Sequence, residues 1–79
     1  GRRAPATPEE LARAVGAGIR AARERGGLTQ QELADRTGIR RPNVARLEKG
    51  SGLPNLATLQ RIATGLELDL VELLSGSAR

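Results

Sequence analysis

Basic side chains are concentrated in one short stretch of this 79-residue sequence. Residues 36–49 contain five basic residues and one acidic residue, Glu48, whereas the whole chain has a net charge of only +4. Guanidinium groups bind anionic groups through paired N–H donors, so the stretch is a candidate site for a polyanion. The alternative is an ordinary solvated, charged face. The basic members are Arg36, Arg40, Arg41, Arg46 and Lys49.

The composition excludes several other kinds of chemistry. The sequence has no Cys, His, Met, Phe, Tyr or Trp. Without thiolates or imidazoles it lacks the usual transition-metal ligands and the commonest catalytic bases, and we expect no metal and no cofactor. The nine acidic residues fall mainly at expected helix starts or on charged faces, so we expect no enzyme activity. Stacking of single-stranded bases on aromatic rings is also excluded.

The basic side chains must be positioned by a core made only of Ala, Leu, Ile and Val, which form the 38% hydrophobic fraction. A chain of this length makes one small domain, and local helix packing is the simplest way for it to bury aliphatic residues. No apolar run approaches the roughly 20 residues that span a bilayer, and no signal-peptide segment is present. We therefore expect an all-α, cytoplasmic protein without a membrane partner.

Recurring start signals divide the chain into helices. Three capping boxes, in which a Thr or Asp precedes a Glu by three residues, predict helix starts at Thr7, Thr29 and Asp69. Asn55 is the expected cap of another helix. With a helix at about 40–48, these signals predict five helices in total.

The helix at about 40–48 carries the centre of the basic stretch, and its start is unusual. Gly38 suits the left-handed residue that ends the preceding helix, so a tight turn joins the two helices. The cap position holds Arg40 in place of Ser, Thr or Asp, and Pro42 disfavours helical torsions at the residue before it. We therefore expect regular helix to begin at Pro42, with Arg41 extended as a non-standard cap.

Apolar residues at helical spacing predict the inward face of each helix. Gly16 and Gly18 weaken the first helix but permit the close approach of a neighbour. The expected inward residues are Leu11, Val15, Ile19, Ala22, Leu33, Ala34, Ile39, Val44, Leu47, Leu56, Leu59, Ile62, Ala63, Leu66, Leu70, Leu73 and Leu74.

Residues 30–49, QQELADRTGIRRPNVARLEK, form a predicted helix-turn-helix unit. Around this unit lie the segments GLTQQELADRTGI, VARLEKG, LATLQRIA and LDLVELL. In the order and spacing of these segments, from about Val15 to Leu74, the sequence resembles the lambda-repressor/Cro-like (XRE) family of helix-turn-helix regulators. The resemblance implies a compact five-helix bundle whose third helix enters the major groove of double-stranded DNA.

The same resemblance implies roles for individual residues. Arg41 and Arg46 would pair with guanine and Asn43 with adenine, although plain solvated charge remains an alternative for the arginines, and Asn43 could instead contact phosphate or its own backbone. The implied base-contact residues are Arg40, Arg41, Asn43 and Arg46. The implied phosphate-contact residues are Thr29, Gln30, Lys49, Ser51 and Arg23.

Two further features follow from the comparison with the family pattern. Arg23 and Glu48 occupy positions where the family often has an ion pair that joins the first helix to the end of the third. Two independent surface charges are the alternative. Pro42 stands where the family has a polar residue that contacts bases, which removes one possible base contact. Glu67 replaces the usual helix-ending glycine, so we expect an irregular turn before the last helix. Because this end of the fold often contributes to dimerisation in the family, the dimer interface stays open.

The sequence therefore predicts a transcriptional repressor that binds a pseudo-palindromic operator as a homodimer, held in the nucleoid. Its expected organisation is a flexible arm at 1–7, a DNA-binding domain at 8–75 and a tail at 76–79. One alternative is an antitoxin that binds a toxin protein and its own operator. Another is the DNA-binding part of a longer regulator with a ligand-sensing domain.

Overall fold

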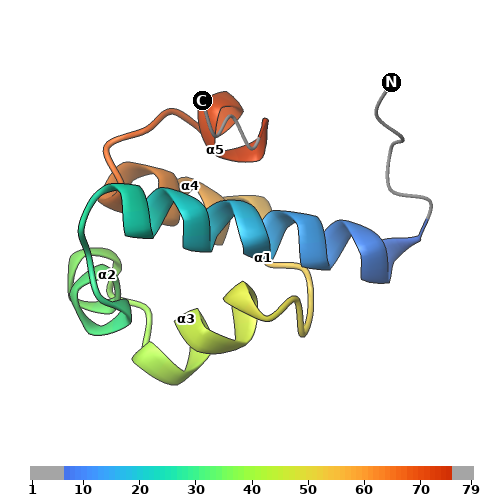
Figure 1. The fold of residues 1–79 in the computed structure, drawn as a ribbon, viewed down its shortest axis with the longest axis horizontal. Coiled ribbons are helices and arrows are strands. Elements are labelled where there is room, and N and C mark those ends of the chain that lie inside the picture. The colour runs from blue at the N-terminus through green and yellow to red at the C-terminus, as the bar shows by residue number, and fades with distance from the viewer. Residues whose placement is uncertain (1–6, 76–79) are drawn as a thin grey trace.

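The structure, a computed structural model, describes residues 7–75, and these residues form five α-helices and no strand (Figure 1). The expected arm, apart from Thr7, and the expected tail at 76–79 lie outside the described residues. Within the described part, no helix is long and apolar enough to cross a membrane. The helices are α1 (Pro8–Arg25), α2 (Gln30–Thr37), α3 (Arg41–Glu48), α4 (Leu56–Gly65) and α5 (Leu70–Leu74).

The predicted helix caps are confirmed. The side chains of Thr7, Thr29 and Asp69 each accept a hydrogen bond from the backbone of the Glu three residues later, and that Glu carboxylate accepts one from the cap backbone. The Asn55 side chain accepts a hydrogen bond from Thr58 N at 2.8 Å. Each cap satisfies backbone N–H groups that have no acceptor inside the helix, which is why these starts can be recognised locally.

The prediction for the start of α3 is wrong by one residue. Arg40, with φ −67° and ψ 142°, is the extended cap, and Arg41 is already helical. The Arg40 carbonyl accepts hydrogen bonds from both Asn43 N (2.9 Å) and Val44 N (3.1 Å). These bonds close the first turn around Arg41 and outweigh the preference for extended backbone before proline. Pro42 costs no hydrogen bond, because N–H groups in the first turn have no helical acceptor.

Figure 1 shows α1 running along the length of the molecule, with α2 and α3 on one side and α5 on the other. Gly16 permits the expected close approach: a Cβ there would collide with the Leu47 carbonyl oxygen and lie 2.9 Å from that of Glu48. A Cβ at Gly18 would meet only the Leu73 carbonyl oxygen, at an ordinary 3.5 Å. The backbone at the end of α3 therefore rests directly on α1 at Gly16.

All five helices contribute to one buried aliphatic cluster. Its largest fully buried members are Ile19, Leu33, Val44 and Ile62. Val15, Ile39, Leu47, Leu66 and Leu70 are partly buried against this cluster.

Three expected core residues are exposed instead. Leu56 is 69% exposed, Leu74 46% and Leu11 42%. Leu11 and Leu56 lie in the first turn of their helices, and Leu74 is the last residue of α5. Helical spacing identifies the inward side of a helix, but it does not reveal how far along its axis neighbouring helices cover it.

The irregular turn expected between α4 and α5 is not seen, because Glu67 itself takes the left-handed position of the helix-ending glycine and the regular hydrogen bonds of such an ending form around it. Glu67 adopts a left-handed backbone conformation, with φ 62°. The amide of Leu68 donates to the Ala63 carbonyl at 2.9 Å, which closes the end of α4 in the manner of a glycine-terminated helix. A side chain with a Cβ in this conformation costs about 1 kcal/mol.

Candidate nucleic-acid interface

The outer face of α3 carries an exposed set of polar and basic side chains. Val44, which is 1% exposed, packs in the core, while Arg41, Pro42, Asn43 and Arg46 are all exposed. This alternation follows from the helical period: one side of a two-turn helix is buried, and the other faces solvent. Arg40, at the cap, is exposed as well.

The expected base-contact side chains have no polar partner inside the molecule. Among residues 7–75, the side chains of Arg40, Arg41, Asn43 and Arg46 make no hydrogen bond or ion pair. The Asn43 side chain therefore does not bond its own backbone, which was one of its alternatives. The donor groups of this face are free to meet an external ligand.

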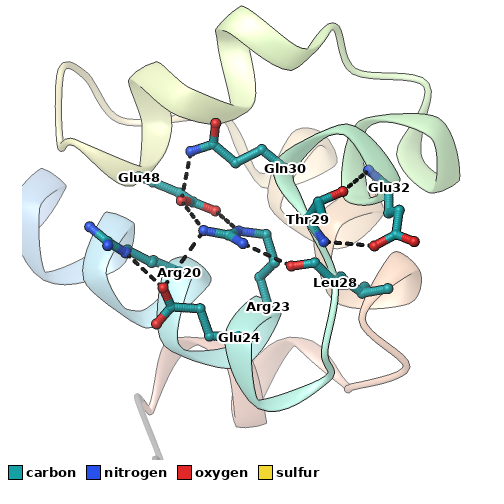
Figure 2. Close-up of polar contacts among 8 residues, drawn as sticks. All are labelled: Arg20, Arg23, Glu24, Leu28, Thr29, Gln30, Glu32 and Glu48. Atoms are coloured by element: carbon teal, nitrogen blue, oxygen red, sulfur yellow. Dashed lines mark hydrogen bonds and ion pairs between the residues drawn. The ribbon is translucent and has the colours of Figure 1, made fainter.

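The other end of α3 is held by a nearly buried ion pair. Arg23 of α1 and Glu48, the last residue of α3, meet through two parallel contacts: Nε to Oε2 at 2.6 Å and Nη2 to Oε1 at 3.0 Å. Their side chains are only 11% and 3% exposed. Arg23 Nη1 also donates to the Leu28 carbonyl at 2.8 Å, so the guanidinium joins α1, α3 and the α1–α2 loop (Figure 2).

The Glu48 carboxylate also holds the first residue of α2. Gln30 Nε2 donates to Glu48 Oε1 at 3.1 Å, and Figure 2 shows Gln30 reaching the carboxylate from α2 while Arg23 reaches it from α1. The hydrogen bond to Glu48 raises the pKa of Arg23 above its ordinary value, and burial acts more weakly in the opposite direction. The guanidinium therefore stays charged at every ordinary pH.

The expected phosphate-contact residues occupy different environments. Lys49 and Ser51 are exposed just after α3. Thr29 caps α2, whose positive dipole end lies there. Gln30 and Arg23 both donate hydrogen bonds to Glu48. Arg23 is the less available of the two for a phosphate, since three of its N–H groups bond Glu48 or the Leu28 carbonyl and only 11% of its side chain is exposed.

A groove of about 460 Å³ lies beside α3, between it, the 51–54 loop and α4. Arginine side chains from three places line it: Arg40, Arg46 and Arg61. No Asp or Glu is among its lining residues, so the charged side chains that line it are all positive. The groove extends the basic surface of α3 onto α4. Its lining residues are Gly38, Ile39, Arg40, Asn43, Arg46, Leu47, Ser51, Gly52, Leu53, Pro54, Thr58 and Arg61.

Sequence reasoning missed Arg61. Its Nε and Nη2 donate to the Thr37 carbonyl at 3.1 and 2.7 Å, across 24 positions of the chain. The Thr37 hydroxyl donates to the Leu33 carbonyl at 2.8 Å and accepts from Ile39 N at 3.2 Å. No local pattern around Arg61 signals these contacts, because they depend on how α4 packs against α2.

Comparison with known proteins agrees with this geometry. The profile of the helix-turn-helix family HTH_3 matches residues 19–73. An uncharacterized HTH-type transcriptional regulator of Methanothermobacter thermautotrophicus is 44% identical over 54 residues, which cover 68% of this chain and 78% of the relative. Antitoxin HigA1 of Mycobacterium tuberculosis is 45% identical over 62 residues, which cover 78% of this chain but only 41% of that protein.

A solved structure shares the fold. The restriction-modification controller protein C.AhdI of Aeromonas hydrophila superposes with a TM-score of 0.76 at 31% identity, covering 78% of this chain and 94% of that chain. The region that the family profile matches, residues 19–73, contains all of α2, α3 and α4. The packing of these helices leaves the polar face of α3 exposed. The chain therefore belongs to the helix-turn-helix family of lambda-repressor/Cro-like (XRE) DNA-binding transcriptional regulators.

Proposed function

We propose that this protein is a sequence-specific repressor that binds a pseudo-palindromic operator as a homodimer and acts by binding, without catalysis, in the nucleoid. The observation that carries the proposal is the outer face of α3, where exposed Arg and Asn side chains have no polar partner among residues 7–75. An α-helix fits the major groove, where each base pair shows a distinct pattern of donors and acceptors.

Base contacts are assigned to the free side chains of this face. Arg41 and Arg46 are suited to bidentate pairing with guanine O6 and N7, and Asn43 to pairing with adenine. Arg40 lines the groove beside α3 and would contact a flanking base. Pro42 has no donor to offer, so discrimination depends mainly on the two arginines.

Phosphate contacts are assigned around the reading helix. Lys49 and Ser51 follow α3, and Thr29 lies at the positive dipole end of α2. Gln30 Nε2 uses one N–H on Glu48 and retains a second for a phosphate. For Arg23 we propose mainly a positioning role, because three of its N–H groups bond Glu48 and the Leu28 carbonyl and only 11% of its side chain is exposed.

A homodimer would place two α3 helices in successive major grooves, about 34 Å apart. Exposed apolar side chains on α5 are available for such an interface: Val71 is 75% exposed and Leu74 is 46% exposed. Apolar groups are favoured at the centre of homodimer interfaces because their burial is the main driving force.

In vitro selection of bound DNA tests the proposal, because it reports the site, its symmetry and its half-site spacing together. We expect a preferred palindromic site whose affinity falls steeply with salt. Binding without a preferred sequence or without salt dependence would contradict the proposal.

Point variants then separate the two kinds of contact. Arg41→Ala and Arg46→Ala should each cost about 1–3 kcal/mol at one base pair and relax specificity there. Lys49→Ala should weaken binding to all sequences alike and lower the salt slope by about 1. Arg36→Ala is the matched control, since Arg36 donates to the Gly65 carbonyl at the end of α4 and lines no part of the groove.

A second candidate function is an antitoxin module, favoured by the similarity to Antitoxin HigA1. The exposed apolar residues of α5 would then bind a toxin protein in place of a second copy. Co-expression with the product of the adjacent gene tests this. Restored growth together with a stable complex that Val71→Asp abolishes would support the antitoxin function.

A longer regulator with a ligand-sensing domain is a further alternative, since the chain spans only 41% of the HigA1 relative. The intact mass of the native gene product tests it.

A further inference from the structure

The start of α3 is not held by its own side chains. The cap residue Arg40 makes no side-chain cap hydrogen bond, unlike the cap residues of the other four helices. Pro42 has no backbone N–H to offer. The direction in which α3 leaves the turn must therefore be set by contacts from elsewhere in the molecule.

Arg61 supplies such a contact from α4. Both its Nε and its Nη2 donate to the carbonyl of Thr37, the last residue of α2, so the planar guanidinium holds this oxygen as a fork. Thr37 is 8% exposed, and its hydroxyl accepts from Ile39 N inside the turn. The turn is thus held on one side by the Thr37 hydroxyl and on the other by Arg61.

Arg61 is itself exposed, but the part of α4 that carries it is buried. Its neighbours in α4, Ile62 and Ala63, are 1% and 0% exposed and belong to the core. The guanidinium lies so close to Gly38, which has φ 74°, that a Cβ there would approach Arg61 Nη2 to 2.9 Å. Its charge faces the negative dipole end of α2, which offsets the repulsion from other arginines of the groove.

We propose that Arg61 is a positioning residue for DNA readout: it fixes the α2–α3 turn and thereby the orientation of Arg40 and Arg41 toward the bases. This inference rests on the proposed DNA-binding function and deepens it. Arg61 also lines the groove next to Arg40 and Arg46, so direct binding of a phosphate is the competing role that the test must separate.

Arg61→Lys and Arg61→Gln separate the two roles, because lysine keeps the charge but loses the fork. Affinity for the selected site and for unrelated DNA is measured over a range of salt, after confirming by thermal unfolding that each variant is folded. Positioning predicts that both variants lose roughly five- to tenfold in the ratio of specific to non-specific affinity, as expected for loss of a hydrogen bond or two. The salt slope of the lysine variant should equal that of the wild type.

The matched control is Arg36→Gln, which removes the single bond from Arg36 Nη1 to the Gly65 carbonyl (3.1 Å) at the other junction of α2 and α4. It should leave the specificity ratio unchanged. An equal loss in this control would show general destabilisation and overturn the inference. A lysine variant with wild-type specificity, beside a glutamine variant whose salt slope falls by about 1, would show a direct phosphate contact and overturn it too.

Failure of the proposed function gives a different result. If wild-type protein shows no preferred DNA site, the proposed function falls and the readout role falls with it. If the wild type prefers a site and the Arg61 variants keep the same ratio of specific to non-specific affinity, the proposed function stands and only the inference about Arg61 is wrong. Amide hydrogen exchange at Ile39 adds a readout without DNA: it should be faster in Arg61→Lys than in Arg36→Gln.

Discussion

The C-terminal end of α3 is tied to the molecule by buried charged side chains, whereas its N-terminal end is tied through backbone atoms. At Glu48, a carboxylate that is 3% exposed accepts bonds from Arg23 and Gln30. At Arg40, the side chain bonds nothing within residues 7–75, and the turn is held through the carbonyl of Thr37. One end of α3 is anchored by its own Glu48 side chain, and the other by Arg61 and Thr37, which lie outside α3. This arrangement leaves the basic side chains near the helix start free for a ligand.

Breaking the anchored end should have the largest effect. Glu48→Gln leaves the Arg23 guanidinium nearly buried without its counter-charge, and we expect the free energy of unfolding to fall by about 3–5 kcal/mol, measured by urea denaturation. Glu24→Gln is the control, because that carboxylate is 55% exposed, pairs with Arg20 at 3.1 Å and only approaches Arg23 Nη2 at 4.0 Å. The control should lose less than about 1 kcal/mol. Equal losses would contradict the difference between buried and exposed pairs.

Gly16→Ala tests the backbone contact beneath the same end. The added methyl would collide with the Leu47 carbonyl and force the end of α3 away from α1, at a cost of about 1–3 kcal/mol despite the better helix propensity of alanine. Gly18→Ala, whose Cβ has ordinary space, should instead stabilise α1 slightly. Thermal unfolding measures both, and a stabilised Gly16→Ala would show that the close approach is not needed.

At the N-terminal end of α3, one substitution should raise the stability of the protein and lower its affinity for DNA. Arg40→Asp adds a side-chain cap and a negative charge at the dipole start of α3, so we expect stability to rise by about 1 kcal/mol. Affinity for DNA should fall, because a positive side chain on the proposed interface becomes negative. Thermal unfolding checks the expected rise in stability, and DNA titration of the same sample checks the expected fall in affinity. A variant that binds DNA as the wild type does would remove Arg40 from the interface.

Gln30→Ala should have the smallest effect. It removes one hydrogen bond to Glu48, which keeps both contacts to Arg23, so we expect a loss of roughly 0.5–1 kcal/mol. Gln31→Ala is the neighbouring control, since within residues 7–75 the Gln31 side chain bonds only the exposed Asp35. Denaturation gives the difference between the variants. A larger drop in DNA affinity than in stability would support the phosphate contact proposed for Gln30.

Much of the fold could be predicted from local sequence signals, and the failures have a common origin. Caps at Thr7, Thr29 and Asp69 were recognisable because donor and acceptor lie three residues apart. The exposure of Leu56 was not, since it depends on where neighbouring helices end. The start of α3 was misplaced because a residue preference at Arg41 was outweighed by the backbone bonds to the Arg40 carbonyl.

For the candidate site, the residue types and spacing determined that α3 would carry basic side chains on its outer face, because one period of a short helix separates Val44 from its exposed neighbours. Only the tertiary structure decided which polar groups are free and which are engaged. Arg23 meets Glu48 across 25 positions, a pairing that the family resemblance implied but no local signal did, and Arg61 meets Thr37 across 24, which nothing in the sequence indicated. Such contacts arise when packed helices bring distant residues together, and no local pattern of the chain encodes them.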